Sequence, residues 1–526
     1  MVPYLMSVTA LLDAQLQRMQ ASVPALDWAL LGAYAGPLGR VAQGWDWRLL
    51  AVTLCCGYLL WEQARYLLRA RSLPGPAWVP PLLGNVVAVV RDPAAFWKKQ
   101  AAFGPLSWNA LVGKYIVYVA DAEVQHKIFS NVHAQGFELI GHPFGKKIFG
   151  ENNMIMMRGE QHKDLRRRLL PLFSVKALGV YVEIQEATIR AHVSRWLAAE
   201  KAVEMRPLVR ALNLETSQTV FVGPYLTPAM RATFTHDYAA FNAGLMAFPL
   251  DLPGTTFNKG ARAVTRIAQT LAVCAAASKA RTVEGTEPAC LMDYWTASLR
   301  EELHAAAEQG RPTPEHCSDL EIGQHVFDFL FAAQDASSSS LLWVMALLEA
   351  HPAVLARVRD EQRALRPDRD APLSADLLAR MRYTKQVALE VLRLRPPAPM
   401  VPHIAAVDYP LTPDYTVPKG TIVFPSVFDA SFQGFTEPHR FDPDRFSEER
   451  REDVRFKRNW LLFGAGPHQC LGQRYAINHI MVFIALISSH VNWERVRTPG
   501  CDEFAYQPTI YPKDGVHVTL SSRPAI

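Results

Sequence analysis

The segment from Phe463 to Gly472 constrains the fold of this chain more than any other feature. It reads Phe-Gly-Ala-Gly-Pro-His-Gln-Cys-Leu-Gly. Gly464 and Gly466 allow backbone conformations that are closed to other residues and permit close approach of a flat ligand. Cys470 stands where a helical pattern begins, so a thiolate there would face backbone N–H groups that stabilise it as a metal ligand. Taken without its neighbours, a lone cysteine is more often an inert buried side chain.

The composition is that of an ordinary globular protein. The chain has 526 residues, a net charge of +5 and 49% hydrophobic residues, and no internal repeat is evident. Its seven cysteines are widely spaced and include no Cys-x-x-Cys pair, which argues against a disulfide framework or a zinc site and for a reducing compartment. No dense Lys/Arg cluster interleaves with aromatic residues, so no nucleic-acid partner is indicated.

The N-terminal region contains an apolar run that is rich in leucine and aromatic residues and is followed by arginines. A full membrane span needs about 20 residues, so this run is short, and an amphipathic helix lying on a membrane or packed on the body is the alternative to a single span. The arginines favour a cytosolic C-terminal side. We therefore expect an N-terminal extension without an assigned role (1–44), a membrane anchor helix (45–63), a basic and Pro-rich hinge (64–85) and one large domain (86–526).

The large domain has a mostly helical pattern. Ser318-x-x-Glu321 is a capping box, and no proline interrupts the apolar pattern from there to Ala350. At about 1.5 Å per residue, this helix is long enough to cross the domain. Stretches rich in β-forming residues predict strands within 111–120, 401–425 and 504–520. We therefore predict a mainly α protein with small peripheral β-sheets (α+β).

Two further motifs combine acidic and basic residues. Glu390-Val-Leu-Arg393 places a carboxylate and a guanidinium on one helix face. Arg445 lies in a Phe-Asp-Pro-Asp-Arg-Phe segment, and arginine suits a buried, bidentate pairing with such a carboxylate. An ordinary surface pair is the alternative for the first motif, and a solvated face is the alternative for the basic cluster from Arg166 to Arg168.

Together these motifs resemble those of the cytochrome P450 family, whose signature Phe-Gly-x-Gly-x-His/Arg-x-Cys-x-Gly matches at every defined position. The companion motifs occur in family order from about residue 74 to residue 520. The resemblance implies a P450 fold that holds haem b (iron protoporphyrin IX) between the long central helix and the cysteine loop, with Cys470 as the iron ligand. It also implies haem-propionate partners at Arg166, His468 and His403, structural support from Glu390, Arg393 and Arg445, and His162 in place of the family's usual tryptophan.

The middle of the long helix, Phe331–Ser340, departs from the family pattern. Ala336 stands where the family usually has a threonine that helps to deliver protons during oxygen activation. The resemblance leaves Asp335 as the proton-relay residue, and Ser337 could supply a hydroxyl or position a water. We predict these two residues as catalytic. The alternative for the serines is hydrogen bonding to carbonyls four residues earlier, which bends a helix.

The same segment resembles the sterol C-22 desaturase branch of the family, as do residues 140–147, 401–405, 424–428 and 466–470. This branch introduces a 22,23 double bond into a sterol side chain with O₂ and with NADPH electrons delivered by NADPH-cytochrome P450 reductase. A membrane anchor suits a sterol substrate, so we expect an endoplasmic reticulum membrane protein with a cytosolic catalytic domain. Candidate substrate-facing residues, for each of which core packing is an equal alternative, are Phe137, Ile140, Phe144, Phe331, Ala332, Met400, Val401 and Ile510.

Four other functions fit parts of the sequence. A sterol hydroxylase or a 14-alpha-demethylase-type monooxygenase would more usually carry threonine at position 336. An O₂-independent haem-thiolate isomerase or dehydratase would turn over a hydroperoxide without NADPH. A cysteine hydrolase would need a histidine paired with Cys470, to which nothing else in the chain points, and a haem sensor without turnover would have no use for Asp335.

Overall fold

The computed structural model describes residues 47–70, 73–140, 145–150, 153–198, 202–283, 285–501, 503–506 and 509–524. The chain divides into two compact units, Met1–Leu68 and Arg69–Ile526. Helix α3 (Trp47–Ala70) covers most of the predicted anchor and continues seven residues beyond its expected end at residue 63. No single helix in these described ranges is both long and apolar enough to cross a membrane. Residues 1–46, which include the predicted N-terminal extension, lie outside the described part of the chain.

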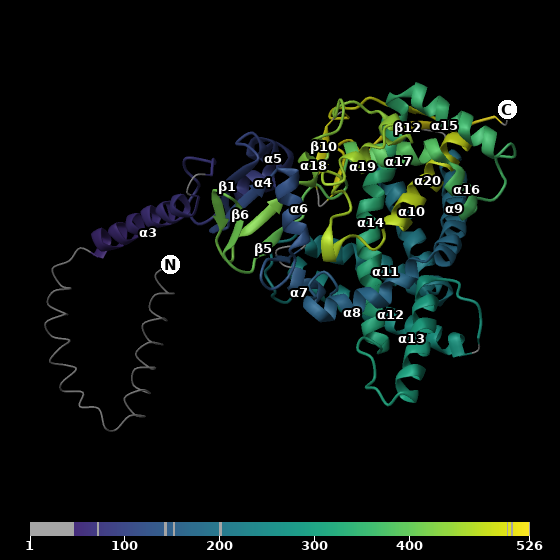
Figure 1. Cartoon of the computed structure of the whole chain (residues 1–526), viewed down its shortest axis with the longest axis horizontal. Helices are drawn as coiled ribbons and strands as arrows, with labels where there is room; N and C mark the ends of the chain where they lie inside the picture. Colours follow the sequence, from purple (N-terminus) through teal and green to yellow (C-terminus); the bar gives the residue numbers. More distant parts are fainter. Residues whose placement is uncertain are drawn as a thin grey trace. The chain divides into compact units, whose positions relative to one another are not determined.

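Helices form most of the second unit (Figure 1). The α-helices are α4 (Val86–Arg91), α5 (Pro93–Ala101), α6 (Ala122–Ser130), α7 (Gly145–Phe149), α8 (Gly159–Leu169), α9 (Val175–Leu197), α10 (Met205–Phe221), α11 (Pro228–Leu245), α12 (Thr256–Val283), α13 (Leu291–Glu308), α14 (Asp319–Ala350), α15 (Pro352–Leu365), α16 (Ala375–Arg380), α17 (Arg382–Leu394), α18 (Val427–Ala430), α19 (Glu452–Arg455) and α20 (Gln473–His490). The 3₁₀ turns are η1 (Leu170–Phe173), η2 (Gly223–Tyr225), η3 (Pro443–Phe446) and η4 (Gly466–His468).

The strands form small sheets, with the largest in the order β1-β2-β8-β5-β3. The remaining pairings are β4-β12-β9, β10-β11 and β6-β7. The strands are β1 (Leu106–Leu111), β2 (Lys114–Val119), β3 (Phe137–Leu139), β4 (Val203–Glu204), β5 (His403–Ala405), β6 (Tyr409–Thr412), β7 (Tyr415–Val417), β8 (Ile422–Pro425), β9 (Val491–Arg495), β10 (Phe504–Tyr506), β11 (Ile510–Pro512) and β12 (His517–Ser522). The predicted β-rich stretches therefore contain strands, and the predicted fold class is confirmed.

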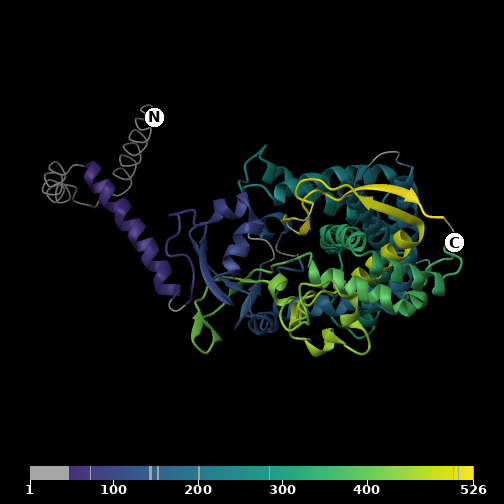
Figure 2. The same cartoon turned by 90° about the horizontal axis from the view of Figure 1, so that it is seen from above.

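Helix α14 is the centre of this unit, and Figure 2 shows it end-on in the middle of the body. It begins with the predicted capping box, in which Ser318 and Glu321 satisfy each other's backbone N–H groups. Helices α10, α12, α17 and α20 contact it along its length. Because it is surrounded in this way, its residues from Leu341 to Leu348 are all buried, and a polar residue in its middle needs a hydrogen-bond partner in the protein, in an ordered water or in a bound ligand.

The Pro-rich segment that we predicted as part of a hinge lies against the edge of the largest sheet. Trp108 N–H donates to Pro74 O at 2.9 Å, and Asn85 N–H donates to Ala110 O at 2.8 Å. Gly84 has a φ of +58°, and a Cβ there would collide with the backbone of Ala110. The segment from residue 74 to residue 85 is therefore hydrogen-bonded to β1.

Candidate active site

The cysteine loop has the close packing that its glycines predicted. Gly464 and Gly466 have φ values of +70° and +68°, and a Cβ on Gly466 would collide with the backbone of Phe129. Cys470 N–H donates to Phe463 O at 2.9 Å, which closes the loop. Helix α20 begins at Gln473, so Cys470 lies in the turn just before the helix instead of starting it.

The Cys470 thiol lies between two opposing influences. Burial raises its pKa, whereas a hydrogen bond from the backbone N–H of Gly472 and the positive charge of Arg166 favour the thiolate. The side chain nevertheless keeps accessible surface. The sulfur is therefore accessible to a ligand, and the Gly472 N–H and Arg166 stabilise its thiolate form. A bound metal ion would complete the deprotonation.

Basic side chains gather beside this sulfur. The rings of His162 and His468 stack with their centroids 3.8 Å apart. Burial lowers the pKa of His468 to about 3, with further lowering from the nearby His162, His403 and Arg166. Burial likewise lowers the pKa values of His162 and His403 to about 4. Among the residues that the structure describes, Arg166 has no carboxylate partner, so this cluster suits an anionic ligand.

This set of residues fits a haem. A cysteine thiolate is an established axial ligand of haem iron. Beside it, Arg166 supplies a positive charge without an acidic partner in the described chain, and the neutral histidine rings can donate hydrogen bonds, which suits the two propionates of such a group. Cys470 would hold the iron, and Arg166, His468 and His403 would bind the propionates; the structure brings all four predicted residues into one neighbourhood.

On α14, Asp335 is buried and forms an ion pair with Arg210 of α10. The four serines that follow differ in their contacts. Ser338 and Ser340 donate to the carbonyls of Gln334 and Ala336 at 2.7 and 3.0 Å, as the alternative interpretation predicted. Ser339 donates to the backbone of β11. Ser337 is buried and has no hydrogen-bond partner among the described residues, which leaves its hydroxyl for a ligand or water.

A directional chain of hydrogen bonds links α20 to α14 through α10. Asn213 Nδ2 donates to Ser338 Oγ at 2.9 Å, and Ser338 donates onward to Gln334 O. Asn213 Oδ1 can only accept, so His479 Nε2, 2.7 Å away, must donate to it. Gln334 Nε2 in turn donates to Arg210 O at 2.8 Å. One face of α10 therefore holds the segment of α14 that carries Asp335.

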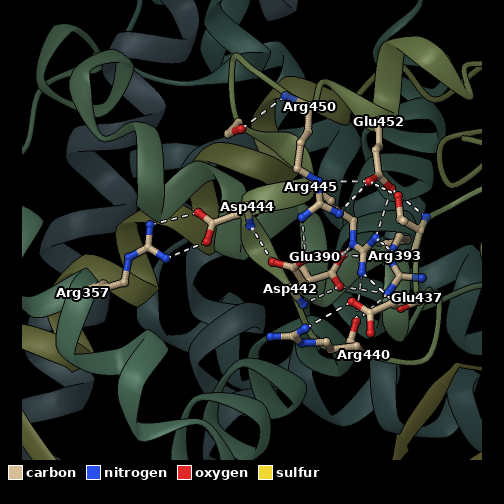
Figure 3. A network of polar contacts seen from close by, with 12 residues as sticks. Arg357, Glu390, Arg393, Glu437, Arg440, Asp442, Asp444, Arg445, Arg450 and Glu452 are labelled. Carbon is tan, nitrogen blue, oxygen red and sulfur yellow. Dashed lines mark hydrogen bonds and ion pairs between the residues drawn. The ribbon is translucent and has the colours of Figure 1, made fainter.

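The acidic and basic motif residues form one buried network (Figure 3). Arg393 contacts Glu390 at 2.7 and 2.9 Å, and Arg445 Nε lies 2.9 Å from Glu390 Oε2. All three side chains are fully buried. Asp442 N–H also donates to Glu390 Oε1 at 2.9 Å. The carboxylate therefore joins α17 to the segment before the cysteine loop.

Glu452 is a further member of this network that its motifs did not reveal. It lies 3.0 Å from Arg445 Nη1. Burial opposes ionisation of Glu452, but hydrogen bonds from Thr436 and Arg450 and the charge of Arg445 outweigh it and lower the pKa to about 2. Two buried guanidinium groups thus meet two carboxylates, which balances the charge of the network.

The candidate substrate-facing residues do not share one environment. Phe137 and Ile510 are almost fully buried, and the ring of Phe137 lies 4.8 Å from that of Tyr409, which agrees with the core-packing alternative. Ala332 is exposed, although Leu330 and Gln334 beside it are buried, so α14 has its accessible face at this turn. The half-buried candidates are Ile140, Phe331, Met400 and Val401. Phe144 lies outside the described residues.

A buried central helix and a glycine-rich cysteine loop with a basic cluster beside the thiol fit a protein that holds a thiolate-ligated cofactor. A sequence profile of the family described as Cytochrome P450 matches residues 73–506. Cytochrome P450 710A2 of Arabidopsis thaliana is 54% identical over 475 residues, which are 89% of this chain and 94% of that protein. C-22 sterol desaturase ERG5A of Gibberella zeae is 32% identical over 499 residues, which are 91% of this chain and 92% of that protein.

Among solved structures, retinoic acid bound cyanobacterial CYP120A1 matches with a TM-score of 0.73 and 25% identity, and the match covers 86% of this chain and 99% of that chain. The chain belongs to the cytochrome P450 family. It is therefore a haem-dependent monooxygenase that receives electrons from a redox partner and acts on a lipophilic substrate.

Several site residues were not found from the sequence. Arg210, Asn213 and His479 belong to no motif, and their partners lie more than one hundred residues away along the chain. The available signal was weak: Arg210 and Asn213 are three residues apart and so share a helix face, as do Asp335 and Ser338. Only the packing of α10 on α14 brings the two pairs together.

Proposed function

We propose that this P450 desaturates the C22–C23 bond of a sterol side chain. The overall reaction removes one hydrogen from each of the two carbons and consumes O₂, NADPH and a proton, releasing two molecules of water and NADP⁺. The observation that carries the proposal is the 32% identity, over 91% of this chain, to a protein named C-22 sterol desaturase. A second such protein, from Aspergillus fumigatus, is 32% identical over 90% of this chain.

The proton-handling residues of α14 support the proposal. Ala336 has no hydroxyl, so proton delivery falls to the neighbouring Asp335 and Ser337. Arg210 forms the ion pair with the buried Asp335 carboxylate and is itself 32% exposed, so this pair extends from the protein surface towards the interior. We infer that Asp335 passes protons inward, with Ser337 or a water held by it as the next carrier.

The remaining candidate residues would bind the haem or orient the sterol. Cys470 would hold the haem iron, and Arg166, His468 and His403 would hold its propionates. When bound, the haem supplies oxygen activation and hydrogen abstraction. Ala332, Phe331, Met400 and Val401 would form part of the contact with the sterol side chain. Their task is to keep C23 close to the reacting centre after C22 has lost its hydrogen, because small changes in position decide between an alkene and an alcohol.

The test uses membranes that contain the full chain, NADPH-cytochrome P450 reductase, NADPH and β-sitosterol, with products identified by mass spectrometry. We expect a product two mass units lighter than the substrate with the double bond at C22–C23. The Cys470→Ala variant and a reaction without NADPH serve as controls. Exclusive formation of hydroxylated or demethylated products from several 24-alkyl sterols would defeat the proposal and favour a hydroxylase or a 14-alpha-demethylase-type enzyme.

We also propose a location in the endoplasmic reticulum membrane with the catalytic domain in the cytosol. The lipophilic substrate and the residues of α3 support this, since large apolar side chains on that helix, such as Leu49, Leu54, Leu60 and Leu68, are exposed. Fractionation of cells that express the full chain, or a chain that begins at residue 73, tests the role of α3. Equal membrane association of both forms would show that α3 is not needed for attachment.

A further inference from the structure

A second group of basic side chains lies where α20 packs against α9 and α15. Figure 1 shows these three helices near one another. It contains five arginines, which we call the arginine cluster: Arg190, Arg359, Arg366, Arg369 and Arg523. Hydrogen bonds to the backbone hold the C-terminal segment beside this group: Arg369 Nη1 donates to Arg523 O at 2.6 Å, and Arg523 N–H donates to His490 O at 2.9 Å. These residues come from four parts of the chain.

Arg366, directly after α15, is the buried member of the arginine cluster. Arg366 is only 3% exposed. Nη2 donates to Arg369 O at 2.6 Å, but Nε and Nη1 are buried and have no hydrogen-bond partner in the described part of the chain. A buried cation that lacks acceptors is costly, so a charged group in this position calls for a further partner.

The nearby carboxylates do not supply that partner. Glu186 contacts Arg190 at 2.8 Å and also accepts the backbone N–H of Leu373 at 2.7 Å. Asp370 is 70% exposed and lies 3.5 Å from Arg190. Asp368 accepts the N–H of Asp370 at 2.9 Å. No described carboxylate lies within ion-pair distance of Arg366, and three carboxylates face five guanidinium groups.

The other groups at this place are also short of negative charge. Arg359 donates to Ser488 O, Val491 O and Asn492 Oδ1, all of which are neutral, and burial together with Arg523 lowers its pKa to about 10. Arg190 Nη1 lies 3.2 Å from His490 Nε2, so this nitrogen must accept and the imidazole is neutral. The Arg523 guanidinium is half-buried and has no partner among the described residues.

We propose that the arginine cluster binds a small oxyanion of the phosphate class. A phosphate group offers several strong acceptors to the guanidinium donors that lack them and carries the negative charge that the three carboxylates do not provide. Arg366 forms the buried floor of the site, and Arg190, Arg369 and Arg523, which are partly exposed, form the entrance. The site is separate from the haem-binding residues and does not rest on the proposed sterol reaction.

The test is calorimetric titration of the full-length holoenzyme with inorganic phosphate, against chloride at matched ionic strength. We expect saturable binding that is weaker by at least about tenfold in Arg366→Gln, because one buried charged hydrogen bond is lost. Arg523→Gln, at the entrance, is a second variant in case Arg366→Gln does not fold. Arg363→Gln is the matched control: this arginine lies on the same helix α15, is 55% exposed and pairs with Asp360.

Titration with AMP shows whether the natural ligand is a free ion or a phosphate ester. Tighter binding of AMP than of inorganic phosphate indicates an ester, and the reverse indicates the free ion; both results keep the proposal. Absence of saturable phosphate binding above the chloride background overturns it, and would mean that water alone satisfies Arg366. Equal phosphate affinity in the parent, Arg366→Gln and Arg523→Gln proteins also overturns it, because binding would then lie elsewhere.

Discussion

The burial of His479 on α20 leads to a quantitative prediction about the stability of the protein in acid. His479 is 1% exposed; its Nε2–H donates to Asn213, and its Nδ1 has no partner among the described residues. Burial lowers its pKa from 6.5 to about 4. The folded protein therefore keeps this ring neutral at pH values where the unfolded chain already protonates it.

This difference in pKa between the folded and unfolded states sets the direction in which stability changes with pH. Between pH 6.5 and pH 4 the unfolded state binds more protons than the folded state, so stability falls as the pH falls. The two pKa values give a loss of about 2 kcal/mol between pH 7.5 and pH 5 from His479 alone. For a chain of this length, that is a decrease of about 2 °C in the unfolding midpoint.

The assay compares thermal unfolding midpoints at pH 7.5 and pH 5, at one scan rate, for the parent and His479→Gln. Glutamine keeps a donor for Asn213 but does not titrate, so the drop between the two pH values should shrink by about 2 °C. His304→Gln is the control, because His304 lies on α13 with a side chain that is 76% exposed. An unchanged drop in His479→Gln would refute the reasoning about burial.

Four further predictions concern the active site and its support. Cys470→Ala should lose the red-shifted Soret band of the reduced CO complex, and a normal band would exclude it as the iron ligand. Glu390→Gln should lower the free energy of unfolding by about 3–5 kcal/mol, measured by denaturant titration, because it leaves two buried guanidinium groups without their shared carboxylate. Arg210→Leu should slow product formation and raise NADPH consumption per product without changing substrate binding, and Arg210→Lys should restore part of the rate by keeping a cation beside Asp335. Ala336→Thr should raise the share of hydroxylated product by restoring the family's hydroxyl, and an unchanged product ratio would show that this position does not decide between the two outcomes.

The sequence predicted best those parts of the molecule whose residues lie close together along the chain. The signature from Phe463 to Gly472 and the pair Glu390 and Arg393 each fit within ten residues, so local backbone geometry brings their side chains together. The capping box at Ser318 is of the same kind. Such features can be recognised from spacing alone, because a helix or a tight loop fixes the geometry.

Boundaries and burial were harder to predict. We expected helical pattern from Cys470, but α20 begins three residues later because the cysteine turn is fixed by its bond to Phe463 O. From the sequence, Phe137 fitted a substrate-facing position as well as a core position. Its full burial depends on how β3 pairs with β5. Neither outcome is encoded in the local pattern, since both depend on contacts with distant parts of the chain.

The contacts of α10 explain why the cysteine loop could be predicted from the sequence, whereas the surroundings of Asp335 could not. The residues around the cysteine must match a cofactor of fixed shape, and a short motif can supply them. The segment around Asp335 is instead held from outside, by Arg210 and Asn213 one turn apart on α10, and Asn213 also receives the His479 hydrogen bond from α20. A substitution on α10 can therefore shift the segment around Asp335 without changing a residue of the cysteine loop or of α14, and under the proton-relay role proposed for Asp335 it would change the products while Cys470 and its neighbours stay the same.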